Sequence, residues 1–184
     1  MENQEINGEL EKPIRFFLYI VLFISALILY GCTTTVLKIQ EFQQKFIKSM
    51  RQPGENMVLS PEDTSKIYSC LGYKQTMLFL EEADVIPDRV FPGEEINHRI
   101  RYALCPYIPS GTIQGKIIRT VLFKGETVFQ DITNYEFKPG TWTVDTFINI
   151  PYSAQSGVYA VDVGLTSYSQ ETIKRSDTFI VKSR

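Results

Sequence analysis

In this sequence, the side chains with the widest range of possible chemistry belong to three cysteines and one histidine. Cys32, Cys70 and Cys105 can be acylated, oxidised to a disulfide or bound to a metal, and His98 can transfer a proton or bind a metal. These residues lack the close spacing that a zinc site uses, and a Ser-His-Asp triad could only be built on His98. His98 lies on the apolar face of a predicted strand over 95–105, where a hydrogen-bonded core histidine is the simpler interpretation. We therefore predict no catalytic residue, no metal site and no cofactor.

The composition points to a folded chain without a strongly charged partner. The 184 residues are 43% hydrophobic and 22% charged, which is typical of a globular domain with an appendage. The net charge of −2 gives no basic footprint for nucleic acid. We expect one domain and no nucleic-acid partner.

Cys32 stands at the end of a long apolar run, in the stretch Leu29-Tyr30-Gly31-Cys32. These four residues resemble the lipobox of bacterial lipoproteins, which has Leu three residues before the cysteine and a small residue directly before it. The resemblance implies a diacylglyceryl group on the Cys32 sulfur, cleavage after Gly31 and acylation of the new N-terminus. Residues 1–31 would then be a signal peptide, and the acyl chains would hold the protein at a membrane.

The length of the apolar run also permits a second interpretation. Phe16 to Tyr30 is 15 residues long, at the upper end of the ~7–15 residues of a signal-peptide apolar region. Extended to Leu37 it would form a helix of about 33 Å, enough to span a bilayer. The alternative is an uncleaved single-pass anchor. In one form of it the domain is cytosolic, which the basic residues after the run would favour: Lys38, Lys45, Lys48 and Arg51.

Cys70 and Cys105 are the two cysteines that remain if Cys32 carries lipid. An exported protein with two cysteines usually pairs them. The alternative is two reduced, buried thiols. A bridge would close a loop of about 35 residues and contribute roughly 3–4 kcal/mol in the chain-entropy model.

Residues 32–73 read as a tether that contains an amphipathic helix. Apolar residues at Val36, Ile39, Phe42, Phe46 and Met50 form one helical stripe, and Pro53-Gly54 ends it. This helix could pack on the domain, lie on the membrane surface or pair with a second copy. Ser60-Pro61 begins a further short helix that extends to about Ser69.

From residue 74 to 184 the sequence predicts an all-β domain. Short apolar runs are separated by Pro-Gly and Gly turns, and the run 95–105 alternates with a period of two. Lys124-Gly125-Glu126 predicts a tight hairpin. The predicted fold is mainly β, a seven-stranded antiparallel sandwich preceded by an N-terminal hydrophobic helix and the short amphipathic helix. The seven strands are expected at 76–85, 95–105, 116–123, 127–132, 141–150, 157–165 and 172–181.

The stretch Ser156-Gly157-Val158-Tyr159-Ala160-Val161 resembles the penultimate strand of immunoglobulin-like and fibronectin-III-like domains. In such domains a tyrosine near the strand start bonds back to the preceding turn. The resemblance covers roughly residues 75 to 183 and implies an Ig-like sandwich. It departs from the antibody type, which has a cysteine in place of Val161 and a tryptophan on the third strand, where this chain has Trp142 on its predicted fifth.

Arginines on two predicted strands form another candidate surface. Arg99 and Arg101 share the polar face of one strand, and Arg119 could join them on one face of a sheet. Such a cluster would be either a solvated, salt-bridged face or a face that binds a partner.

These observations favour a lipid-anchored, exported envelope protein that acts as a non-catalytic binding or structural module. It would lie on the periplasmic or cell-surface side of a membrane and engage a protein partner through loops or an edge strand. The alternative function is a single-pass membrane subunit of a larger complex with an uncleaved N-terminal helix. A hydrolase-like enzyme is the least favoured reading of the residue inventory.

Overall fold

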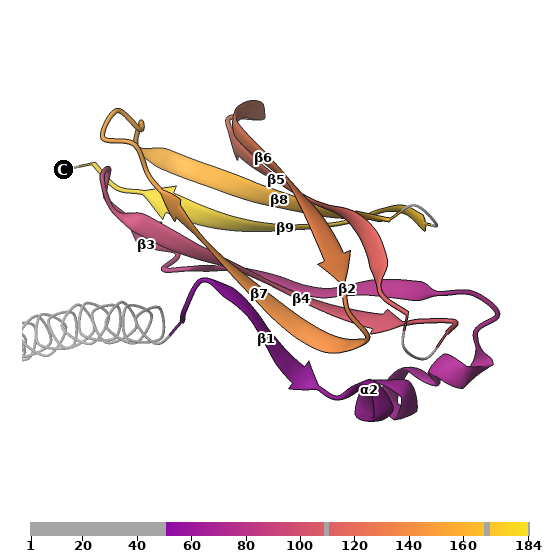
Figure 1. Cartoon of the computed structure of the whole chain (residues 1–184). Coiled ribbons are helices and arrows are strands. Elements are labelled where there is room, and N and C mark those ends of the chain that lie inside the picture. The colour runs from indigo at the N-terminus through magenta and orange to yellow at the C-terminus, as the bar shows by residue number, and fades with distance from the viewer. Residues whose placement is uncertain (1–50, 109–110, 168–169, 184) are drawn as a thin grey trace, which may run out of the picture. The chain divides into compact units, whose positions relative to one another are not determined.

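The computed structural model describes residues 51–108, 111–167 and 170–183 (Figure 1). The lipobox-like stretch with Cys32, the predicted signal peptide or anchor and the amphipathic stripe 36–50 lie outside these ranges. Within the described ranges, no helix has the length and apolar character needed to cross a membrane.

The described chain is mainly β and forms two sheets that pack face to face (Figure 1). The first sheet has four strands in the order β1-β7-β4-β2, all paired antiparallel. Its strands span Gly54–Leu59 (β1), Gly140–Asn149 (β7), Glu95–Cys105 (β4) and Met77–Ile86 (β2).

The second sheet has five strands in the order β3-β9-β8-β5-β6. The short strand β3 runs parallel to β9, and the other pairs are antiparallel. The strands span Arg89–Val90 (β3), Gln170–Val181 (β9), Gly157–Ser167 (β8), Ile113–Phe123 (β5) and Glu126–Phe137 (β6).

The space between the sheets is filled by apolar side chains that alternate along the strands. Tyr102 of β4 packs edge-to-face on Phe137 of β6, with ring centroids 5.1 Å apart. Leu104 and Leu165 contribute to the same cluster from opposite sheets. A second cluster lies around Tyr159 and completes the core. Burial of these side chains supplies the main favourable free energy of folding, at roughly 25 cal/mol per Å² of apolar surface.

Turn chemistry sets the β5–β6 hairpin. Lys124 and Gly125 connect the two strands with φ angles of 53° and 86°. Two successive positive φ values are typical of the tight hairpin turns that match the twist of antiparallel strands. The hairpin predicted from Lys124-Gly125-Glu126 is therefore confirmed.

The number of strands differs from the prediction. The described residues form nine strands, not seven, and one pair is parallel. Of the two unpredicted strands, β3 has two residues and β1 has six. Residues 54–59, which we had assigned to the tether, form β1, whose burial pattern shows no alternation.

The predicted helix start at Ser60 agrees with the structure: α2 spans Pro61–Tyr68, and the Ser60 hydroxyl accepts a hydrogen bond from the Asp63 backbone N–H. A single 3₁₀ turn, η1, follows over Cys70–Gly72.

The two sides of the sandwich are joined differently. On the β2–β9 side, the Asp177 carboxylate accepts a hydrogen bond from the Val85 backbone N–H at 2.7 Å, and Arg175 Nε donates to the Leu80 carbonyl at 2.8 Å. On the opposite side, Glu55 of β1 accepts hydrogen bonds from Tyr135 of β6 and from Lys138. Burial acts to raise the pKa of Glu55, but the hydrogen bonds from Lys138 and Tyr135 outweigh it, so the pKa lies below its usual value. We call these three residues the Glu55 clasp.

Cys70 of η1 and Cys105 of β4 are bonded to each other, with their Cα atoms 5.3 Å apart. This separation lies within the range that a disulfide needs. The pair attaches the α2–η1 segment to a central strand of the four-stranded sheet, since Cys105 is almost fully buried at the end of β4.

We predict that this bridge forms in the protein. Alkylation of the unfolded, non-reduced full-length chain should leave Cys70 and Cys105 unmodified by mass spectrometry. Reduction should lower the free energy of unfolding of the wild-type protein by about 3 kcal/mol, because it frees a loop of about 35 residues. The same reduction should change little in Cys70→Ser. Alkylation of both cysteines without prior reduction would contradict the prediction.

Candidate functional site

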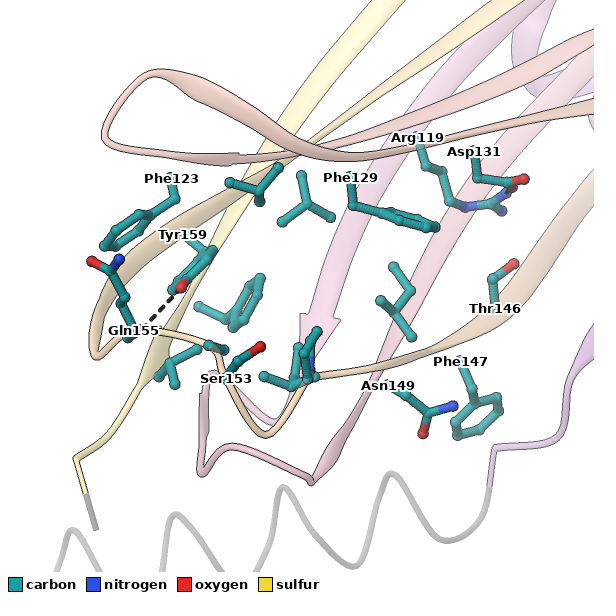
Figure 2. A pocket seen from close by; sticks show the side chains of 18 residues that line it. Arg119, Phe123, Phe129, Asp131, Thr146, Phe147, Asn149, Ser153, Gln155 and Tyr159 are labelled. Carbon is teal, nitrogen blue, oxygen red and sulfur yellow. Dashed lines mark hydrogen bonds and ion pairs between the residues drawn. The ribbon is translucent and has the colours of Figure 1, made fainter.

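An apolar groove opens between the two sheets on the side where their edges are only partly joined (Figure 2). Its volume is about 620 Å³, within the ~300–1,000 Å³ typical of ligand sites. Strands β5 and β6 form one wall, the second half of β7 with the loop after it forms the other, and side chains of β8 and β9 lie at its back.

The β6 wall exposes apolar side chains at the edge of a sheet. Val128 is 55% exposed and Phe129 is 48% exposed, and both line the groove. Phe129 pairs in register with the buried Val121, so it lies on the inward face, and a bulge displaces Val128 from the ladder. In the described part of the chain, no strand pairs with the outer edge of β6. An exposed apolar edge strand promotes association with other chains, which makes this wall a candidate binding surface.

The β7 wall presents the edge of its strand as well as its face. Successive side chains of a strand point to opposite faces, so only alternate residues can line a groove that touches one face. Here every residue from Thr146 to Pro151 lines it. The pairing of β1 with β7 ends at Asp145, and the groove begins where this pairing ends.

A buried cation lies at one end of the groove. Arg119 of β5 is only 2% exposed. Its Nε donates a hydrogen bond to Nδ1 of His98 at 3.2 Å, and its Nη1 lies 3.9 Å from the Asp131 carboxylate of β6. Its Nη2 is buried without a hydrogen-bond partner among the described residues. Burial lowers the pKa of Arg119 and Asp131 partly opposes this, so the guanidinium is an incompletely compensated charge.

His98 is a hydrogen-bonded core residue, as predicted, and it is neutral. It is fully buried on β4, and its Nδ1 accepts from Arg119. Burial, together with the charge of Arg119, lowers the pKa of His98 to about 3, although Asp145 acts in the opposite direction. Among residues 51–108, 111–167 and 170–183, no three His, Cys, Asp or Glu side chains are grouped so that they could hold a metal ion.

Arg99 and Arg101 share one face of β4 and each forms an ion pair, as the salt-bridged alternative predicted. Arg119 does not join them, so that part of the prediction was wrong. Arg99 makes two hydrogen bonds to Asp145, at 2.9 and 2.7 Å, and Arg101 pairs with Glu81 at 2.8 Å, both within the first sheet. Arg119 belongs to the other sheet and points inward. The signal was present in the sequence: Ile117, Arg119 and Val121 share one face of β5, so alternation alone places Arg119 among apolar residues.

No protein-family model matches the chain, and no curated protein matches it. Among solved structures, it is similar to a family 123 glycoside hydrolase from Clostridium perfringens (11% identity, TM-score 0.41, covering 52% of this chain and 22% of that one). It is also similar to the sporulation control protein Spo0M from Bacillus subtilis (14%, TM-score 0.37, covering 60% and 49%) and to the alkylpurine DNA glycosylase AlkC from Pseudomonas fluorescens bound to DNA (12%, TM-score 0.43, covering 58% and 30%). The match spans less than half the length of each of these chains. At such identities and TM-scores, the likenesses assign neither a family nor a function to this protein.

The buried, neutral state of His98 predicts a pH dependence of stability. The pKa is about 3 in the folded protein and about 6.5 in an unfolded chain, so the unfolded state binds more protons between these values. The free energy of unfolding should therefore fall as the pH decreases from about 6.5 towards 3, by up to ~1.4 kcal/mol per pH unit.

The contribution of His98 can be isolated with His98→Gln, which retains an acceptor for Arg119. Urea unfolding of the full-length chain in detergent at pH 7, 6, 5 and 4 should give a smaller pH slope in the variant than in the wild-type protein. Carboxylates contribute equally to both proteins, so the difference reports His98 alone. Identical slopes would contradict the assignment.

Proposed function

We propose that this protein is a lipid-anchored, exported module of a bacterial envelope that binds a protein partner without catalysis. The lipobox-like residues before Cys32 support the anchor, and the bonded pair Cys70–Cys105 is compatible with an oxidising compartment. The described domain is of the immunoglobulin-like kind. This is supported by Tyr159, whose hydroxyl donates to the Gln155 carbonyl at 2.9 Å in the preceding turn, the contact that the resemblance implied.

The groove beside β6 is the observation that carries the binding function. It combines an edge strand, exposed apolar side chains and a cavity that continues into the core of the sandwich. An extended peptide that pairs with β6 would gain main-chain hydrogen bonds, and its alternate side chains would enter the groove. The bound ligand is therefore an apolar, extended segment of a partner protein.

Processing at Cys32 tests the anchor. Mass spectrometry of the protein extracted from membranes should show a chain that begins at Cys32 and carries acyl groups. Cys32→Ala should prevent cleavage and leave the leader attached. An intact N-terminus on the wild-type protein, with an unmodified Cys32, would instead favour the single-pass membrane subunit.

Peptide binding tests the groove. Random decapeptides displayed on a carrier should yield binders of the full-length protein in detergent, with apolar residues at alternate positions. Val128→Gln should weaken these binders by about tenfold, because it removes an apolar contact of a Val side chain.

Ile132→Gln is the matched control for this substitution. Val128 and Ile132 are on the same strand and are each 55% exposed, but only Val128 lines the groove. The control should bind like the wild-type protein. Equal weakening by both substitutions, or no enriched peptide at all, would overturn the assignment of the groove.

A further inference from the structure

We infer that the segment bound in the groove is the C-terminal end of the partner chain, with its terminal carboxylate at Arg119. This inference rests on the proposed function, because it concerns the ligand of the same groove. It adds the chemical identity of the part of the partner that is recognised, a free chain end.

The charge at Arg119 provides the first reason. The guanidinium is 2% exposed, and the described residues give its Nη2 no acceptor. His98 is neutral, and among the described residues the carboxylate paired with Arg119 is that of the partly exposed Asp131, at 3.9 Å. A buried donor without an acceptor is costly, and a carboxylate is the group that a guanidinium binds best. The site is therefore complementary to one added negative charge.

The distribution of polar groups provides the second reason. Figure 2 shows Arg119 and Asp131 at one end of the groove and Phe123 and Tyr159 at the other. Between them the walls are mostly apolar, with Val121, Phe129 and Ile148 among the lining residues. A ligand that matches this pattern has one charge at its end and apolar groups along its length.

The Glu55 clasp provides the third reason, because it joins the edges of the two sheets further along β6 than the groove extends. Tyr135 of β6 donates to Glu55 of β1, and Lys138 binds the same carboxylate. These contacts join the edges of the two sheets, and the groove lining on β6 extends no further than Asp131. A bound segment that continued past Arg119 along β6 would meet the clasp at Tyr135, four residues after Asp131. This favours the end of a chain over the side chain of an internal Asp or Glu as the source of the carboxylate.

Two neighbours of Arg119 shape the approach of this carboxylate. Asp131 lies at Nη1, so the open position is at Nη2. Phe129 and Arg119 both line the groove, and Nη2 is buried in the unbound protein. Binding therefore requires neighbouring side chains to turn aside and uncover Nη2.

The test compares decapeptides that end in a free carboxylate with the same decapeptides whose C-terminus is blocked. Two libraries are displayed on a carrier, one fused through its N-terminus and one through its C-terminus, and each is selected on the full-length protein in detergent. Binders should come from the library with free C-termini. Synthetic versions of these binders should bind at least about tenfold tighter as acids than as amides, since hydrogen bonds to a charged group are the stronger kind.

Two substitutions assign this preference to Arg119. Arg119→Met should reduce the acid-to-amide ratio to about one, with amide binding retained. Asp131→Asn should raise the affinity for the acid but not for the amide, because it removes the competing carboxylate. Glu126→Gln, which removes one charge from an exposed position on β6, is the matched control and should change neither.

The outcomes separate this inference from the proposed function. Equal binding of acids and amides by the wild-type protein would overturn the C-terminal assignment and leave peptide binding in the groove intact. An acid preference that persists in Arg119→Met would overturn the role of Arg119. If Arg119→Met does not fold, the comparison of acids with amides on the wild-type protein and the effect of Asp131→Asn still test the C-terminal assignment. Absence of binders from both libraries would overturn the proposed function itself.

Discussion

The contact between β1 and β6 decides how the sandwich is closed. Both sheets bury apolar faces against each other, but their edges meet in different ways on the two sides. Asp177 and Arg175 connect β9 to β2 on one side. On the other, the described contacts between the edges are those of the Glu55 clasp, and β1 pairs with β7 no further than Asp145. The groove exists because the edge strand β1 is shorter than its neighbour β7, so that part of β7 is left without a flanking strand. A longer β1 would flank β7 along the groove.

Burial of the pair Arg119–His98 costs free energy of folding, and the packing of the core does not offset this cost in an evident way. A charged side chain in an apolar interior is destabilising unless it is fully paired, and hydrophobic replacements of buried ions are often neutral or stabilising. Here the histidine is neutral and one guanidinium nitrogen has no acceptor within the described chain. The Arg119 guanidinium therefore places an unsatisfied hydrogen-bond donor at the end of an apolar groove. A ligand that supplies an acceptor there gains specificity from a group that the free protein leaves unsatisfied.

Sequence patterns predicted the parts of the fold that are encoded locally. The alternation over 95–105 and the turn at Lys124-Gly125 correspond to β4 and to the β5–β6 hairpin, because side-chain period and turn conformation depend on neighbouring residues. The strands β1 and β3 were missed, since β1 shows no alternation, β3 has only two residues, and each is defined by pairing with residues far away in the chain. The inward orientation of Arg119 was accessible from the pattern of β5. The groove was not, because it depends on where the pairing of β1 with β7 stops.

The bond between Cys70 and Cys105 limits how far the domain can be unfolded by tension on its N-terminal side. The described chain begins at Arg51, whose guanidinium binds Asp84 and Asn97, and continues into the edge strand β1. Tension from the N-terminal side acts on these contacts, then on the ladder between β1 and β7 and then on α2. Peeling of residues 54–69 would release roughly 50 Å of extended chain at ~3.3 Å per residue. The next residue is Cys70, which is covalently tied to the interior strand β4. Under tension the chain can therefore lengthen by this fixed amount while β4 and the other interior strands remain folded.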